Sequence, residues 1–220
     1  MSATTLKDTA LALVAPGKGI LAADESHATI GRRFEALGIP NNEEQRRRYR
    51  QMLFTTKGIS EFISGVILFD ETIRQSADDG RTFVGVLASE GIIPGIKVDR
   101  GAKPLAGAPG EQVTEGLDGL RERLAEYRKL GARFAKWRAV IAIGEDGRTP
   151  TRLCLEANAH ALARYAALCQ EAEIVPIVEP EVLMDGGHSI ERSASRLPRP
   201  RSTRSSTRCG STTWYWRDCC

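Results

Sequence analysis

The sequence has few of the residues that build metal sites and disulfide frameworks. It contains five cysteines and three histidines in 220 residues. The histidines lie far apart, and no cysteines have the paired spacing of a zinc site or a disulfide scaffold. This argues against a zinc-dependent enzyme, and we expect neither a metal nor any other cofactor.

Long apolar segments and nucleotide-binding motifs are also lacking. No apolar run reaches the roughly 18 residues of a membrane helix, and residues 1–19 have no signal-peptide core followed by a cleavage site. The GKG at 17–19 has neither the GxGxxG nor the Walker spacing, which argues against nucleotide binding. Because hydrophobic residues make up 41% and charged residues 27%, we expect a globular cytoplasmic protein without a membrane partner.

Charge is distributed unevenly along the chain. Residues 191–220 carry seven arginines against Glu191 and Asp218, a balance of +5, which leaves −2 of the total +3 for residues 1–190. The tail has no aliphatic residue after Leu197, so it cannot bury enough apolar area to order itself. We expect a folded domain over 1–190 and a disordered tail over 191–220. A basic tail could bind nucleic acid, but without RGG or RS repeats we expect no nucleic-acid partner.

Short apolar runs alternate with helical patterns. Strands are expected within 17–26, 63–72, 94–101, 131–144 and 175–183, and helices over 1–15, 43–57, 111–130 and 152–172. Strands of this kind separated by helices predict a parallel sheet buried on both faces. Without a dinucleotide turn, the α/β pattern favours a (β/α)8 TIM barrel, incomplete, with about the first five β/α units. Its first and fifth strands would be open edges.

Ionisable residues recur on the predicted strands, several of them near the carboxyl ends. They are Asp24, Asp70, Glu71, Lys97, Asp99, Lys136, Arg138, Glu179 and Glu181. In TIM barrels the working residues lie at these carboxyl ends. Lysine and arginine suit phosphate, and a carboxylate beside lysines suits proton transfer on a carbonyl compound. The alternative is a structural ion-pair network. We interpret Asp70 and Glu71 as structural, and the charges of 43–50 as a solvated helix face.

Several long motifs resemble one enzyme family in order and spacing. They are GKGILAADES, SGVILFDET, GIKVDRG, PLAGAPGE, GLDGL, FAKWRAVI, NAHALARYAALCQ and IVPIVEPEVLMDG. Over about residues 5–192 the chain resembles the class I (Schiff-base) fructose-bisphosphate aldolases of glycolysis. The resemblance implies reversible, metal-free cleavage of fructose 1,6-bisphosphate to glycerone phosphate and glyceraldehyde 3-phosphate. It also implies a sugar phosphate as the small-molecule partner and a family that is often homotetrameric.

The resemblance assigns catalytic roles to four residues. Asp24 in LAADES matches the aspartate that assists carbon–carbon cleavage. Lys136 in AKWR matches the lysine beside the Schiff-base site, where a second cation depresses the pKa of the nucleophile. Glu179 in VEPE matches the general acid/base of carbinolamine dehydration, and Glu181 matches the carboxylate that follows it.

The resemblance also assigns four substrate-binding residues. Lys97 in GIKVD matches an active-site lysine that handles phosphate and charge, and Arg138 matches a phosphate-binding arginine. Ser26 and Arg33 resemble positions near the distal phosphate.

Two departures from the family pattern stand out. Residues 185–188 read DGGH where the family has DGDH, and the 220 residues contain no LEGTLLKPN-like segment, whose lysine forms the Schiff base. We therefore expect this chain itself to be inactive. A non-catalytic sugar-phosphate-binding protein is the alternative.

We hypothesise that the sequence after about residue 192 is read out of frame. Residues 214–220 and a stop can be written UGG UAC UGG AGG GAC UGC UGC UGA. Read from the third base, this gives Val-Leu-Glu-Gly-Leu-Leu-Leu followed by an A, with which lysine codons begin. Resequencing the coding DNA is expected to give an LEGxLLK-like segment in another frame. If neither other frame contains one, the hypothesis is wrong.

Overall fold

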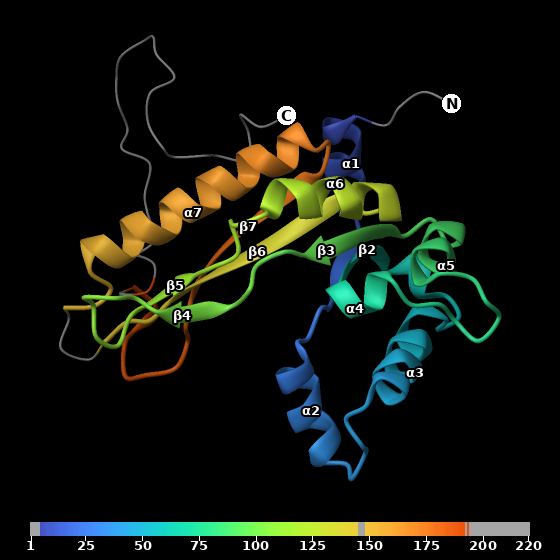
Figure 1. Cartoon of the computed structure of the whole chain (residues 1–220), viewed down its shortest axis with the longest axis horizontal. Coiled ribbons are helices and arrows are strands. Elements are labelled where there is room, and N and C mark those ends of the chain that lie inside the picture. Colours follow the sequence, from blue (N-terminus) through green and yellow to red (C-terminus); the bar gives the residue numbers. More distant parts are fainter. Residues whose placement is uncertain (1–4, 145–147, 192, 194–220) are drawn as a thin grey trace. The chain divides into compact units, whose positions relative to one another are not determined.

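The computed structural model describes residues 5–144, 148–191 and 193, so the expectation for most of the tail lies outside the described residues. Figure 1 shows the alternation of helices and strands along the chain. The elements are α1 (Leu6–Leu13), β1 (Gly19–Ala23), α2 (His27–Glu35), α3 (Glu43–Phe54), a 3-10 turn (Ile59–Glu61), β2 (Ile63–Leu68), α4 (Asp70–Ile73), α5 (Phe83–Ser89), β3 (Ile93–Lys97), β4 (Ala102–Pro104), β5 (Gln112–Thr114), α6 (Leu120–Leu130), β6 (Phe134–Ile141), α7 (Arg152–Glu171) and β7 (Val175–Val182).

The main sheet has the strand order β1-β2-β3-β6-β7. β1 pairs with β2, β2 with β3, and β3 with β6, all in parallel. Each strand follows its predecessor through a crossover that contains helix, as the sequence predicted. In the part of the chain that the structure describes, β1 and β7 are the terminal strands. They are the two strands that were expected at the edges of the sheet.

The described residues divide into two compact units. The first comprises 5–98, 119–136 and 168–177, and the second comprises 99–118, 137–144, 148–167, 178–191 and 193. The chain of β6 and of β7 runs from the first unit into the second. Each unit is described by itself below.

The core of the first unit forms where α1 packs on the strands. A capping box between Thr5 and Asp8 begins this helix. Leu13 then packs with Ile67 and Phe134 in one buried cluster. The hydroxyl of Ser64 donates a 2.6 Å hydrogen bond to the carbonyl oxygen of Leu13. This bond fixes the end of α1 against β2.

Two glycines make space for the Phe134 ring in this core. A Cβ atom added at Gly95 would lie 2.3–2.5 Å from three atoms of the ring. At Gly65 it would lie 2.6 Å from Leu13 and 3.0 Å from Phe134. Because Gly95 is the register partner of Phe134 on the neighbouring strand, the large ring covers the position that a side chain would occupy. Protein interiors are packed tightly enough that even one added methyl group would displace it.

The core of the second unit lies between β6 and α7. Trp137 is fully buried, and its ring centroid lies 5.5 Å from that of Tyr165. Buried Asn158 accepts a hydrogen bond from the backbone N–H of Thr114 and donates one to the carbonyl oxygen of Gln112. One side chain thereby ties α7 to the β4–β5 hairpin.

The prediction of one helix over 111–130 is wrong in its first half. Residues 112–114 form β5, which pairs with β4 in an antiparallel hairpin. Gly116 and Gly119 have φ values of 133° and 63°, a left-handed backbone that glycine adopts without strain. Helix α6 therefore begins only at Leu120. Leu120, Leu124 and Tyr127 form the buried face of this helix.

Replacing Gly95 by alanine is expected to destabilise the first unit, because the new methyl group would collide with the Phe134 ring. Overpacking of this kind typically costs about 1–3 kcal/mol. Gly19→Ala is the matched control, since a Cβ there meets no atom within 4 Å, and its effect should stay within about 0.5 kcal/mol. Urea unfolding of both variants measures the difference. Equal losses would contradict the packing described for Gly95.

Candidate active site

Strand β6 changes from apolar to charged along one of its faces. Alternate residues of a strand face opposite sides of the sheet. Phe134, Lys136 and Arg138 therefore share one side, and Trp137 lies on the other, where it is fully buried. Lys136 and Arg138 are half-buried among buried neighbours, as expected for charges placed within an apolar strand.

In the first unit, Asp24 and Lys136 form an ion pair. The Lys136 ammonium lies 3.5 Å from a carboxylate oxygen of Asp24, and the two side chains are 13% and 11% exposed. Asp24 directly follows β1, whereas Lys136 lies on β6. Two strands stand between them, so a flat sheet would separate their strands by about 14 Å. The sheet must therefore curve until Asp24 and Lys136 face each other, as in a barrel.

Lys97 lies beside this pair. It ends β3 and is the register partner of Lys136 on the neighbouring strand, so the two lysines lie on the same face of the sheet. Two ammonium groups and one carboxylate thus belong to three strands: Asp24 follows the end of β1, Lys97 ends β3, and Lys136 is the third residue of β6. Such a group can attract a phosphorylated substrate and exchange a proton with it.

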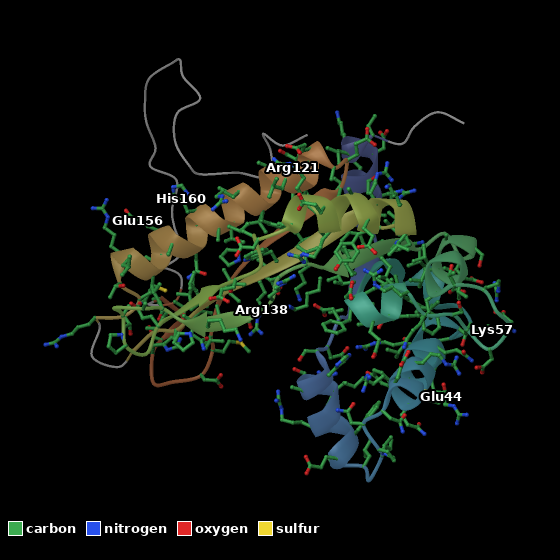
Figure 2. All side chains as sticks on the ribbon, in the orientation of Figure 1. Glu44, Lys57, Arg121, Arg138, Glu156 and His160 are labelled. Carbon is green, nitrogen blue, oxygen red and sulfur yellow. The ribbon has the colours of Figure 1, made fainter. Side chains whose placement is uncertain are left out.

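In the second unit, Arg138 and Glu181 form an ion pair. The Arg138 guanidinium donates to the Glu181 carboxylate, and their side chains are 43% and 38% exposed. The hydrogen bond to Glu181 raises the pKa of Arg138, against an opposing effect of burial, and the charges of Glu179 and Asp99 raise it further. Figure 2 shows the Arg138 side chain on β6. The guanidinium of Arg138 is therefore positively charged, and a phosphate would have to compete with Glu181 to bind it.

Glu179 shares a face of β7 with Glu181, because the two residues are two positions apart. Asp99 accepts hydrogen bonds from the backbone N–H of Gly101, at 3.0 Å, and from that of Arg138, at 3.4 Å. The second unit thus gathers three carboxylates around one guanidinium.

Ser26 and Arg33 have local partners. The Ser26 hydroxyl caps helix α2 by accepting a 3.3 Å hydrogen bond from the N–H of Thr29. Arg33 is largely exposed and forms an ion pair with Glu25. Neither contact involves the Asp24–Lys136 pair. Their assignment near the distal phosphate stays a prediction.

The expectation of a solvated helix face over 43–50 is wrong for Arg50. Only 2% of this residue is exposed, and it forms an ion pair with Glu25 and donates to the carbonyl oxygen of that residue at 3.3 Å. One turn earlier, Arg46 pairs with Glu71 at 2.6 Å. The signal for these pairs was present in the sequence. Two glutamates follow β1 and β2, and a run of arginines lies on the helix between those strands.

The interpretation of Asp70 and Glu71 as structural agrees with their contacts. Asp70 accepts hydrogen bonds from Tyr127 and Arg74, each at 2.9 Å, and Glu71 holds Arg46 through two hydrogen bonds.

The described residues contain no group of three or more His, Cys, Asp and Glu side chains that could hold a metal ion. No helix among them has the length and apolar character needed to span a bilayer.

Comparisons with known proteins give one consistent result. A family model described as fructose-bisphosphate aldolase class-I matches residues 5–197. The "Probable fructose-bisphosphate aldolase class 1" of Xanthomonas campestris is 67% identical over 191 residues, which cover 87% of this chain and 57% of the relative. A cytosolic fructose-bisphosphate aldolase of Arabidopsis thaliana is 55% identical over 81% of this chain and 45% of its own length.

A solved structure agrees with these matches. It is a fructose-bisphosphate aldolase from Plasmodium falciparum in complex with TRAP and a small-molecule inhibitor. It matches with a TM-score of 0.84 and 53% identity over 86% of this chain and 55% of that one. This chain thus spans about half the length of the relatives it matches. The structural match also confirms the predicted fold class, an incomplete (β/α)8 barrel. The chain belongs to the class I fructose-bisphosphate aldolase family.

Proposed function

We propose that these residues carry acid/base and substrate-binding groups of a fructose-bisphosphate aldolase. The reaction is the reversible cleavage of fructose 1,6-bisphosphate to glycerone phosphate and glyceraldehyde 3-phosphate. The observation that carries the proposal is the ion pair of Asp24 and Lys136, which is largely shielded from solvent and lies beside Lys97 of the neighbouring strand. Membership of the aldolase family supports it.

The group in the first unit suits carbon–carbon cleavage. When the bond between C3 and C4 breaks, the hydroxyl on C4 loses its proton and becomes the aldehyde, and the electron pair of the bond stays with C3 and is accepted by C2, which is an iminium carbon in the family's reaction. The carboxylate of Asp24 can assist this proton transfer. Lys97 and Lys136 supply positive charge that attracts the bisphosphate. Lys97 and Lys136 belong to strands and Asp24 directly follows one, so the sheet holds all three in fixed positions.

The group in the second unit suits dehydration and phosphate binding. A carbinolamine loses water only when its hydroxyl receives a proton, and Glu179 is the proposed donor. The Glu181 carboxylate orients the Arg138 guanidinium. We propose that phosphate binding exchanges one anionic partner of Arg138 for another, since a guanidinium matches both carboxylate and phosphate.

The family's covalent nucleophile has no counterpart in the 220 residues, because no LEGTLLKPN-like segment occurs in them. Without the Schiff-base lysine the covalent route is closed, and residues that act as a unit lose nearly all of their effect together. We therefore propose that a polypeptide limited to these residues binds the sugar phosphate without turning it over. The sequence-based alternative, a non-catalytic sugar-phosphate-binding protein, describes this behaviour.

We also propose a cytoplasmic location, supported by the cytosolic relative from Arabidopsis thaliana. The homotetramer expected from the family stays a prediction for this chain.

Replacing Lys136 by methionine is expected to weaken binding of fructose 1,6-bisphosphate by about tenfold, because one charge-assisted contact to the ligand is lost. Isothermal titration calorimetry of the full chain measures the affinity. Lys57→Met is the matched control. That lysine is exposed, belongs to the same unit and is labelled in Figure 2, so its loss should leave the affinity unchanged.

Lys136→Met removes the cation that pairs with Asp24, so unfolding could cause a loss of binding. Lys97→Met is a second variant that leaves this ion pair intact. Lys97→Met should also weaken binding. Equal affinities for the original chain and all three variants would contradict the proposed site. In a coupled assay for glyceraldehyde 3-phosphate, the chain alone should show no turnover. Turnover would show that another residue serves as nucleophile.

A further inference from the structure

Each residue of the segment that leads from β1 into α2 is held by a different contact. Asp24 pairs with Lys136 at 3.5 Å. Glu25 forms an ion pair with Arg50 of α3. Ser26 caps α2 through its hydroxyl. The segment is thereby fixed along its whole length, and Arg50 provides the contact at its middle residue.

Arg50 holds Glu25 in two places. Its guanidinium donates one hydrogen bond to a carboxylate oxygen of Glu25 and another, at 3.3 Å, to the backbone carbonyl oxygen of the same residue. The side chains of Arg50 and Glu25 are 3% and 10% exposed. A planar guanidinium can donate to both acceptors at once, which the single ammonium of a lysine does poorly. Both the side chain and the backbone of Glu25 are therefore oriented by a residue on another helix.

The second carboxylate oxygen of Glu25 binds Arg33 of α2. One oxygen of Glu25 thus accepts from Arg50, and the other accepts from Arg33. The Arg33 side chain is 60% exposed. An exposed arginine ordinarily samples many rotamers, and ordering it costs free energy. Here one edge of the guanidinium is already held, and its remaining donors are open to a ligand.

The charges of this trio favour an anion. Two guanidinium groups and one carboxylate leave one net positive charge. Because Arg50 neutralises Glu25, the charge of Arg33 remains available to a phosphate. Without Arg50, Glu25 and Arg33 would form a neutral pair, and a phosphate would compete with the whole carboxylate for the same guanidinium.

Stability alone explains the burial of Arg50 poorly. A buried ion pair contributes little net stability, because removing two charges from water costs about as much as their attraction returns. The Nε of Arg50 is also buried and has no hydrogen-bond acceptor among the described residues, which adds to the cost. A role in fixing the geometry of Glu25 and Arg33 accounts for the arrangement better.

We propose that Arg50 is a positioning residue for phosphate binding. By holding Glu25, it orients the exposed guanidinium of Arg33 toward the 6-phosphate of the sugar bisphosphate, which is the phosphate farther from C2. This inference rests on the proposed function and on the predicted place of Arg33 near the distal phosphate. It adds to the determinants of substrate affinity a buried residue that touches no ligand.

The test compares two ligands by isothermal titration calorimetry of the full 220-residue chain. They are fructose 1,6-bisphosphate and fructose 1-phosphate, which lacks the 6-phosphate. Arg50→Met should weaken binding of the bisphosphate by about tenfold, because Glu25 then competes fully with the phosphate. It should leave the affinity for the monophosphate unchanged. A merely structural loss would weaken both ligands alike, and that result would overturn the proposal.

Arg47→Met is the matched control. Arg47 lies on the same helix and forms ion pairs with Glu44 and Asp78, neither of which contacts Glu25 or Arg33. Its replacement removes a comparable set of charges from α3 and should leave both affinities unchanged. Equal effects of Arg47→Met and Arg50→Met would contradict a specific role for Arg50.

A double-mutant cycle shows whether Arg50 acts through Arg33, and it needs only the bisphosphate. Arg33→Met alone should weaken binding by about tenfold. Adding Arg50→Met to that variant should change the affinity by less than about twofold, since the residue that Arg50 positions is then missing. An effect of Arg50→Met that is the same with and without Arg33 would overturn the proposal.

Arg50→Lys decides the matter if circular dichroism shows that Arg50→Met is unfolded. Lysine keeps the charge but cannot hold the carboxylate and the backbone oxygen of Glu25 together. We expect a loss of about threefold for the bisphosphate and none for the monophosphate. An unchanged affinity for the bisphosphate would show that only the charge matters and would overturn the positioning role.

The outcomes separate this inference from the proposed function. If the original chain does not bind fructose 1,6-bisphosphate, the proposed function is contradicted and this inference fails with it. Binding that depends on Lys97 and Lys136 but not on Arg50 supports the proposed function and overturns this inference alone.

Discussion

The ion pair between Asp24 and Lys136 constrains the first unit. It can form only because the sheet curves, since two strands lie between the partners. The curvature in turn depends on what fills the concave side. There the Phe134 ring lies over Gly95, and Leu13 reaches down over Gly65. Larger residues at Gly65 and Gly95 would displace the Phe134 ring and change the curvature of the sheet. The distance between Asp24 and Lys136 therefore depends on the packing around these glycines.

Much of the fold could be predicted from the sequence, because strands buried on both faces have continuous apolar runs. Four strands of the main sheet lie within predicted ranges, β3 begins one residue before its range at Ile93, and α1, α3 and α7 fall where helices were expected. Helix α2 was missed because it is short and its start depends on a cap at Ser26. The β4–β5 hairpin was missed because its three-residue strands are held by tertiary contacts, notably that of Asn158, which no local pattern reveals.

The candidate site was predictable where strand geometry alone places side chains. Charges on one face of a curved parallel sheet come together, as the Asp24–Lys136 ion pair and the register partnership of Lys97 and Lys136 show. Partners on helices were not predictable, because they depend on how the helices pack. Arg50 looked like part of a solvated run but is buried against Glu25. Arg138 was predicted to bind phosphate, and in the structure its guanidinium donates a hydrogen bond to the Glu181 carboxylate.

The apolar floor of the first unit, made by Leu13, Ile67 and Phe134, affects more than stability. An apolar region of low dielectric constant beneath charged groups directs their electric field toward the solvent rather than through the protein. The two lysines above it therefore act on an approaching anion more strongly than the same charges on an open surface. Salt also screens half-buried charges less than exposed ones. In the proposed site, an apolar cluster outside the ligand contacts would thus set how far into solution the two lysines attract an anion.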